Sequence, residues 1–314
     1  MSSIAASAGA DAPLRIICGP TAAGKSALAL ALAERHGAWL LSADSRQVYR
    51  GFDIGTAKPT AAERSRVPHR GLDVAEPTER WSAARWAQDA ARWLDEAAAA
   101  GHPALLVGGS GLWLRALVRP LADEPPMDPD RRRAMQDALG ALPTTELRRW
   151  VAELDASRAH LGRTQLLRAA EVALLTGTRL SDWHAAGAAK PRRAARWLVV
   201  DPGEALPGAI AGRLDRMLIS GWPEEVRRLA GHVPPDAPAW NACGYREIRE
   251  AVDAGAPVAA VRDRILVATR QYAKRQRTWF RTQLAGEPDV LRLDPRAPDA
   301  LARADRWFRG SDDA

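Results

Sequence analysis

The sequence is poor in cysteine and has no long hydrophobic run. Only two of its 314 residues, Cys18 and Cys243, are cysteines, which excludes a disulfide-stapled scaffold and a cysteine-rich zinc module and favours a reducing cytoplasm. No apolar run approaches the roughly 20 residues that a membrane-spanning helix needs, so we expect no integral membrane protein. Residues 1–12 are small and polar and lack the features of a secretory signal, and we expect them to be disordered.

Lysine is scarce as well. Of the 45 basic residues only four are lysines, namely Lys25, Lys58, Lys190 and Lys274, and the 38 acidic residues leave a net charge of +7. A GC-rich genome, which the abundance of alanine also suggests, explains the arginine excess most simply. Recognition of phosphate or nucleic acid is the alternative, because the guanidinium fork matches phosphate oxygens. The total charge does not decide between the two.

Short apolar runs alternate with helical segments along most of the chain. Strands are predicted over residues 14–18, 39–42, 104–107 and 197–200, with helices between them. This alternation predicts an α/β fold, in which helices flank a parallel sheet on both faces. Between about residues 121 and 196 no strand is evident, which predicts an all-helical insertion.

A complete phosphate-loop motif lies between the first predicted strand and the first predicted helix. The run Gly-Pro-Thr-Ala-Ala-Gly-Lys-Ser matches G-x-x-x-x-G-K-[ST] in the context that this motif requires. Its glycines turn backbone N–H groups onto an anion, the lysine reaches the terminal phosphates, and the serine hydroxyl can hold Mg²⁺. The motif predicts binding of a di- or triphosphate by Gly19, Pro20, Thr21, Ala22, Ala23, Gly24, Lys25 and Ser26.

The predicted elements divide the chain into a core, an insertion and two ends. The core carries the phosphate loop and is discontinuous, because the insertion interrupts it. We expect a disordered N-terminus over residues 1–12, a P-loop catalytic core over 13–120 and 197–290, a helical insertion over 121–196 and a C-terminal tail over 291–314.

The usual signals of a nucleotide hydrolase are missing. The strand over 104–107 ends in Gly108-Gly109-Ser110, where a Walker-B carboxylate is expected, and no Asn-Lys-x-Asp motif occurs. Asp44, just past the second strand, is the nearest carboxylate. Because the carboxyl ends of parallel strands line the ligand crevice, Asp44 should face the phosphate loop. Taken alone, Asp44 is explained more simply as a turn or cap residue.

Several longer blocks match one protein family. The blocks are Ser42–Tyr49, Phe52–Pro59, His69–Asp73, Val107–Gly111, Arg168–Val172, Gly244–Glu247 and Ala268–Gln276. In this order they resemble the tRNA dimethylallyltransferase (IPP transferase) family over about residues 14–281. The phosphate loop itself is generic, whereas the Asp-Ser…Gly-Thr-Ala-Lys-Pro and Thr-Arg-Gln…Lys-Arg-Gln blocks are specific.

The resemblance implies a P-loop NTPase-like fold and a Mg²⁺-dependent prenyl transfer. The dimethylallyl group of dimethylallyl diphosphate would pass to N6 of the adenosine just 3′ of the anticodon, in tRNAs that read codons beginning with U. The phosphate loop would hold the prenyl diphosphate rather than ATP. The helical insertion would grip the anticodon stem-loop.

The chemistry of the residues fits such a transfer. An adenine amino group is a poor nucleophile because its lone pair is delocalised into the ring, so the reaction needs a stabilised leaving group and removal of the N6 proton. The phosphate loop with Lys25 and Mg²⁺ supplies the first, and Asp44 as general base supplies the second. By resemblance, Thr21 positions the diphosphate, Arg213 contacts the diphosphate or the reacting groups, and Gln271 belongs to the catalytic set.

The resemblance also implies a set of tRNA contacts. The sequence departs from the family's pattern at Ser110, where threonine is common, at Gln165, where arginine is usual, and at Gly71, which replaces an apolar residue. The implied contacts are Asp44, Ser45, Arg46, Gln47, Ser110, Arg132, Gln165, Arg168, Gly244, Tyr245, Arg246, Arg270 and Lys274.

A basic face is predicted on a long helix over residues 257–284. Arg270, Lys274, Arg277 and Arg281 are spaced to share one side of this helix, opposite an apolar stripe. This face is either ordinary solvated charge or a surface that follows RNA phosphates.

Three other functions compete with tRNA prenylation. A small-molecule P-loop phosphotransferase shares the phosphate loop, but the missing Walker-B carboxylate disfavours it. Prenylation of free AMP does not explain the insertion or the basic helix. An RNA-binding module with a vestigial nucleotide site is disfavoured by the intact Gly24-Lys25-Ser26 near Asp44. We expect a monomeric cytoplasmic enzyme that does not bind membranes.

Overall fold

The computed structural model describes residues 12–119, 125–187 and 192–310. The chain forms two compact units, one made of Met1–Val118 and Arg193–Ala314 and the other of Arg119–Arg192. We call them the core unit and the helical unit. The disorder expected over residues 1–12 falls outside the described residues, except for the last position.

The core unit is built on a parallel sheet of six strands in the order β3-β2-β4-β1-β5-β6. The expected α/β fold with a parallel sheet is therefore confirmed. The middle strands are largely apolar, as is usual where helices cover both faces of a parallel sheet. The strands span Leu14–Cys18 (β1), Trp39–Ser42 (β2), His69–Arg70 (β3), Ala104–Gly108 (β4), Ala195–Val200 (β5) and Val290–Leu293 (β6).

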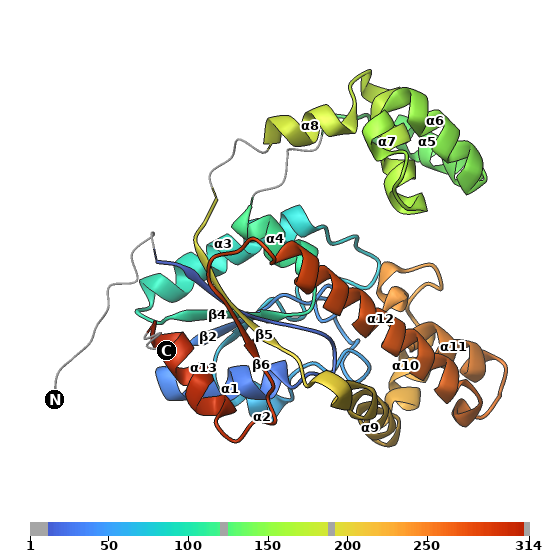
Figure 1. Ribbon diagram of the computed structural model, residues 1–314. Helices are drawn as coiled ribbons and strands as arrows, with labels where there is room; N and C mark the ends of the chain where they lie inside the picture. Colours follow the sequence, from blue (N-terminus) through green and yellow to red (C-terminus); the bar gives the residue numbers. More distant parts are fainter. Residues whose placement is uncertain (1–11, 120–124, 188–191, 311–314) are drawn as a thin grey trace. The chain divides into compact units, whose positions relative to one another are not determined.

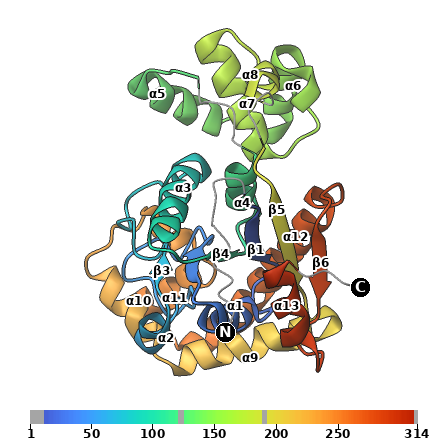
Figure 2. The same ribbon diagram turned by 90° about the vertical axis from the view of Figure 1, so that its left-hand side faces the viewer.

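Helices lie on both faces of this sheet (Figure 1). Helices α1 and α13 cover one face and α3 and α4 the other. Helix α9, gold in Figure 2, follows the carboxyl end of β5. The helices of the core unit span Lys25–His36 (α1), Ala61–Arg66 (α2), Ala83–Ala99 (α3), Gly111–Val118 (α4), Leu206–Ile219 (α9), Trp222–Ala230 (α10), Tyr245–Asp253 (α11), Arg262–Gln283 (α12) and Ala300–Arg309 (α13).

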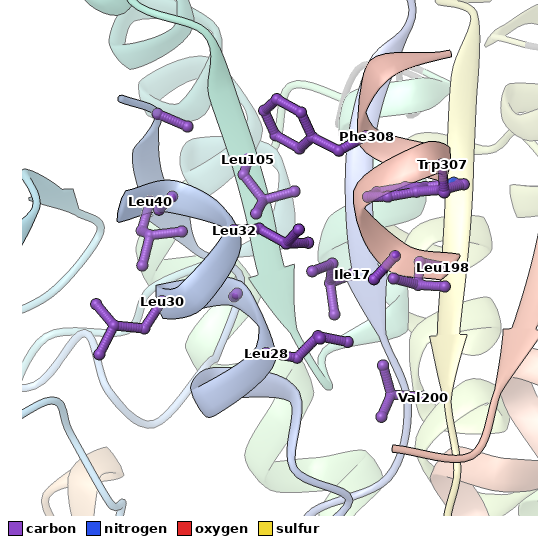
Figure 3. Packing of buried hydrophobic residues seen from close by; sticks show 14 of the residues in the cluster. Ile17, Leu28, Leu30, Leu32, Leu40, Leu105, Leu198, Val200, Trp307 and Phe308 are labelled. Atoms are coloured by element: carbon purple, nitrogen blue, oxygen red, sulfur yellow. The ribbon is translucent and has the colours of Figure 1, made fainter. Parts of the chain in front are cut away.

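Figure 3 shows the hydrophobic core between the sheet, α1 and α13. Ile17, Leu105 and Leu198 project from three neighbouring strands. They meet Leu32 of α1 and Trp307 of α13, and each of the five side chains is at most 1% exposed. The helix that follows the phosphate loop is therefore packed against both the sheet and the end of the chain.

The expectation of a C-terminal tail over residues 291–314 is wrong for most of that range. β6 pairs in parallel with β5, and Trp307 and Phe308 of α13 are buried in the core. Local pattern did not reveal β6, because it has four residues and its pairing partner lies about 90 residues earlier in the chain. The core unit also resumes at Arg193 rather than at residue 197, and its strand β5 begins at Ala195. Residues 311–314 lie outside the described part.

Two smaller expectations also differ from the structure. The sheet has an additional short strand, β3, which the sequence pattern did not predict because it spans two residues. The long helix expected over 257–284 begins with a 3₁₀ turn over Val258–Val261, and α12 starts only at Arg262.

The helical unit has its own hydrophobic core. Helices α5 (Pro129–Gly140), α6 (Thr144–Leu154), α7 (Arg163–Thr176) and α8 (Leu180–Gly187) form it, and its described residues contain no strand. Asp128 caps α5 by accepting a hydrogen bond from the Arg131 N–H. Leu147 and Leu166 are fully buried between the helices. Within the described ranges of both units, no helix combines the length and apolar character needed to cross a membrane.

The packing of α13 predicts the effect of truncating Trp307. We expect Trp307→Ala to lower the free energy of unfolding by about 3 to 5 kcal/mol, because it leaves a cavity in the core. Leu301→Ala is the matched control, since Leu301 lies on the same helix and is 40% exposed. Denaturant unfolding measures both variants, and a C-terminal segment that does not pack on the sheet would give the same small change in each.

Candidate active site

A cavity of about 600 Å³ lies in the core unit at the carboxyl ends of β1, β2 and β4. The phosphate loop after β1, Asp44 after β2 and Gly109 after β4 line it on one side. Residues of α9 and α12, among them Arg213 and Tyr272, line it on the other side. The structure thus brings Thr21, Lys25 and Ser26 of the phosphate loop together with Asp44 and with Arg213, which lies more than 180 residues later in the sequence.

The phosphate loop adopts a conformation that depends on its glycines. Gly19 has a φ of +141°, and a Cβ there would lie 2.1 Å from the Val200 carbonyl oxygen. Gly24 has a φ of +86° and precedes the first residue of α1, which is Lys25. The helix N-terminus therefore faces the cavity with its unpaired backbone N–H groups, as an anion site requires.

Two of the cationic side chains that line this cavity, Lys25 and Arg213, have no ion-pair partner among the described residues. The Lys25 ammonium donates a hydrogen bond to the Pro20 carbonyl oxygen at 2.6 Å. Burial, followed by the nearby Arg213, lowers the pKa of Lys25 to about 8. Burial also lowers the pKa of Arg213, while Asp44 acts in the opposite direction. Among the described residues, the Arg213 side chain makes no hydrogen bond or ion pair. A bound anion would relieve the cost of burying both charges.

Asp44 lies in a loop that is held from several sides. One carboxylate oxygen accepts a hydrogen bond from the Arg46 N–H at 2.8 Å. The Ser110 hydroxyl accepts one from the Ser45 N–H at 2.9 Å, which ties this loop to the end of β4. The Gln47 amide accepts from the Ser42 hydroxyl and donates to the backbone near Thr56. Ser110 and Gln47, expected to contact tRNA, thus fix the loop that carries Asp44.

Lys58 forms the buried anchor of the same loop. Its ammonium donates to the Tyr49 carbonyl oxygen and to the carboxylates of Asp53 and Asp73. Burial acts to raise the pKa of Asp73, but hydrogen bonds from Lys58 and Arg64 outweigh it and hold the pKa below its ordinary value. A compact ammonium with three donors suits three acceptors that converge on one point.

A second network ties this loop to α10 and α11. The buried Glu225 carboxylate accepts hydrogen bonds from the N–H groups of Asp53 and Ile54 and from the Tyr245 hydroxyl. That hydroxyl in turn accepts from the Gly55 N–H. Tyr245 is 0% exposed and Gly244 is buried beside it. The expectation that Tyr245 and Gly244 contact tRNA directly is therefore not supported by their positions, since both belong to the packed support of the loop.

The face of α12 differs in part from the expected one. Arg270, Lys274 and Arg281 are exposed, as a solvent-facing basic surface requires. Arg277 does not belong to this surface, because it pairs with Asp201. Gln271 is exposed and does not line the cavity, so the structure does not bring it to the other candidate catalytic residues.

The candidate contacts of the helical unit are engaged within that unit. Arg132 and Arg168 both pair with the buried Glu171 carboxylate. Gln165 accepts a hydrogen bond from the Gly162 N–H and so caps the start of α7. Outside this unit, Arg246 is exposed and donates to Asn241.

Sequence reasoning missed the cavity-facing side of α12. Ile265, Thr269, Tyr272 and Gln276 all line the cavity, at intervals of four, three and four residues. Gln276 is 6% exposed and its side-chain amide contacts both Thr21 and Gly109. The signal was available, since a glutamine at helical spacing from an apolar stripe predicts a buried polar group with partners. Cys243 and Trp222 complete this wall.

Comparison with known proteins gives consistent matches over most of the chain. A family model described as IPP transferase matches residues 47–283, and one described as isopentenyl transferase matches residues 12–72. A tRNA dimethylallyltransferase of Rhodospirillum centenum is 43% identical over 294 residues, which are 91% of this chain and 93% of the relative. A protein of the same name from Gloeobacter violaceus is 43% identical over 291 residues, covering 90% and 92%.

Solved structures show the same likeness. The full-length tRNA isopentenylpyrophosphate transferase of Bacillus halodurans superposes with a TM-score of 0.68 and 28% identity, covering 95% of this chain and 96% of that one. A eukaryotic dimethylallyltransferase acting on tRNA has a TM-score of 0.79 at 22% identity, with 95% and 80% covered, which bears on the fold alone.

The anchor at Lys58 predicts a stability effect centred on the loop around Asp44. We expect Lys58→Met to lower the free energy of unfolding by about 3 to 5 kcal/mol, because it leaves two carboxylates without their buried cation. Hydrogen exchange of residues 46–58 should become faster. Arg64→Met, which removes a more exposed partner of Asp73, should cost about 1 kcal/mol or less. Equal hydrogen-exchange rates for residues 46–58 in the two variants would contradict the anchoring role of Lys58.

Proposed function

This chain belongs to the IPP transferase family and is a tRNA prenyltransferase, and we propose that it moves the dimethylallyl group of dimethylallyl diphosphate to N6 of the adenosine just 3′ of the anticodon. The tRNAs would be those that read codons beginning with U. The observation that carries this proposal is the cavity that joins a phosphate loop and two partly buried cations, Lys25 and Arg213, to Asp44.

The diphosphate would occupy the cationic end of the cavity. The N–H groups at the start of α1, the Lys25 ammonium and the Arg213 guanidinium would neutralise the charge that grows on the leaving diphosphate as the allylic carbon–oxygen bond breaks. Thr21 would help to orient the diphosphate from within the loop. As the diphosphate arrives, the depressed pKa of Lys25 should rise again, because an anion favours the charged form.

Asp44 would accept the proton that leaves N6. Its carboxylate lies on the cavity wall and its loop is fixed by Lys58 and Glu225, so the base would be in place before the substrate binds. The proton leaves as the nitrogen lone pair attacks the allylic carbon, which makes the poor adenine nucleophile competent.

The residues present are compatible with Mg²⁺ bound together with the substrate. The Ser26 hydroxyl lines the cavity at the start of α1, and Mg²⁺ commonly takes one or two protein oxygens with the remaining sites filled by phosphate and water. Within the described ranges no group of three His, Cys, Asp or Glu side chains could hold a metal without substrate. Bound there, Mg²⁺ would add positive charge at the leaving diphosphate.

The tRNA would bind through exposed basic residues. Arg270, Lys274 and Arg281 of α12 form such a surface in the core unit. Ser45 and Arg46, next to Asp44, would meet the nucleotides that flank the target adenosine. The helical unit would hold the anticodon stem-loop. Arg132 and Arg168 would contact the RNA while they keep their ion pairs with Glu171. We propose a monomer in the cytoplasm, a reducing compartment that suits the two free cysteines.

Neither alternative enzyme gains support from the geometry. A phosphotransferase would be expected to carry a carboxylate at the end of β4, but a Cβ at Gly108 would lie 2.1 Å from the Ala43 carbonyl oxygen. Prenylation of free AMP leaves the basic surface of α12 without a role.

The proposal predicts the effect of removing the base. We expect Asp44→Asn to lower kcat by about 10²- to 10⁴-fold, the usual contribution of general base catalysis, while tRNA affinity stays within about twofold. The assay incubates protein, dimethylallyl diphosphate, Mg²⁺ and unmodified tRNA, and detects a C5 gain on adenine by mass spectrometry.

The exposed Asp236→Asn is the matched control and should retain full activity. No C5 product from the wild-type protein would contradict the proposed function. Full turnover by Asp44→Asn would contradict only the assignment of the base.

A further inference from the structure

Gln276 joins two walls of the phosphate site through one side-chain amide. Its Oε1 accepts a hydrogen bond from the Thr21 N–H at 2.8 Å, and its Nε2 donates to the Gly109 carbonyl oxygen at 3.0 Å. Thr21 belongs to the phosphate loop and Gly109 to the end of β4. Both bonds connect α12 to segments more than 150 residues away in the sequence, and the side chain is 6% exposed.

A side-chain amide satisfies both contacts at once. The bridge needs an acceptor toward Thr21 and a donor toward Gly109, whereas an ionised carboxylate offers acceptors alone and a thioether offers neither in strength. The local backbone has adapted to this side chain, since a Cβ at position 109 would lie 2.2 Å from Nε2. The glycine at the end of β4 is thus explained by the amide that fills the space beside it.

The bridge fixes the phosphate loop independently of any bound anion. Because the Thr21 N–H is bonded to Gln276, the orientation of this peptide is set in the free protein. The remaining N–H groups of the loop and Lys25 are then presented in one arrangement. A site ordered in advance loses less entropy on binding.

We propose that Gln276 is a positioning residue for the diphosphate, which holds the phosphate loop and the end of β4 in the register that diphosphate binding needs. It acts through Thr21 and Gly109. This inference rests on the proposed function, in which the same site holds the diphosphate of the prenyl donor.

The test uses inorganic pyrophosphate with Mg²⁺, so that binding is measured apart from prenyl transfer. Gln276→Met keeps the size of the side chain and removes both strong hydrogen bonds. Gly109→Ala disturbs the same bridge from its other end without changing α12. Gln283→Met is the matched control, because Gln283 is an exposed glutamine at the end of the same helix.

We expect Gln276→Met and Gly109→Ala to raise the pyrophosphate Kd, measured by calorimetry, by about tenfold to a hundredfold, as the loss of a buried hydrogen-bond partner suggests. The KM for the prenyl donor should rise with it, while tRNA affinity stays within about twofold and Gln283→Met behaves as wild type. A role in packing alone would leave pyrophosphate affinity unchanged in Gln276→Met.

Three outcomes separate the claims. Unchanged pyrophosphate affinity in a folded Gln276→Met protein, together with normal prenyl transfer by the wild type, overturns the role of Gln276 and leaves the proposed function intact. If Gln276→Met does not fold, unchanged pyrophosphate affinity in Gly109→Ala overturns the role of Gln276 in the same way. A wild-type protein that binds no pyrophosphate overturns both proposals.

Discussion

The site depends on two partly buried cations, for which no carboxylate among the described residues serves as an ion-pair partner. Lys25 and Arg213 face one cavity, and burial lowers the pKa of both. Their charge is costly in the free protein and is compensated when an anion with several oxygens binds between them. The diphosphate becomes more negative as it leaves, so its attraction to the two cations strengthens in the transition state. The uncompensated positive charge of the free protein therefore stabilises the transition state more than the bound substrate.

The remainder of the core unit keeps the other reacting group opposite these cations. Asp44 follows β2, and its loop is tied to β4 by Ser110, to the buried ammonium of Lys58 and to the Glu225 carboxylate of α10. The phosphate loop is held in turn by Gln276. Each tie joins segments that are distant in the sequence, so the alignment of base and diphosphate depends on the whole unit rather than on either motif.

Local signals predicted the centre of the site, and long-range contacts account for what they missed. The phosphate loop was predictable because its glycines, lysine and serine are contiguous, and Asp44 because strand ends converge at one edge of a parallel sheet. The pairing of β6 with β5 and the docking of α13 gave no comparable signal. Tyr245 and Arg277 carry residue types that suit RNA, but the Glu225 carboxylate and Asp201 engage them. Gln271 and Gln276 differ by five positions on one helix, which places them on opposite sides and separates the exposed residue from the buried one.

The most direct test of this account is the pKa of Lys25 in the free and pyrophosphate-bound protein. The scarcity of lysine makes the measurement practical, because the chain has only four lysines and Lys25→Arg identifies the signal in an NMR titration of labelled lysine. We predict a pKa of about 8 in the free protein and a marked rise when pyrophosphate and Mg²⁺ bind. An ordinary lysine pKa of about 10.4 in the free protein, unchanged by pyrophosphate, would contradict the claim that the site is organised around partly buried positive charge that a diphosphate neutralises.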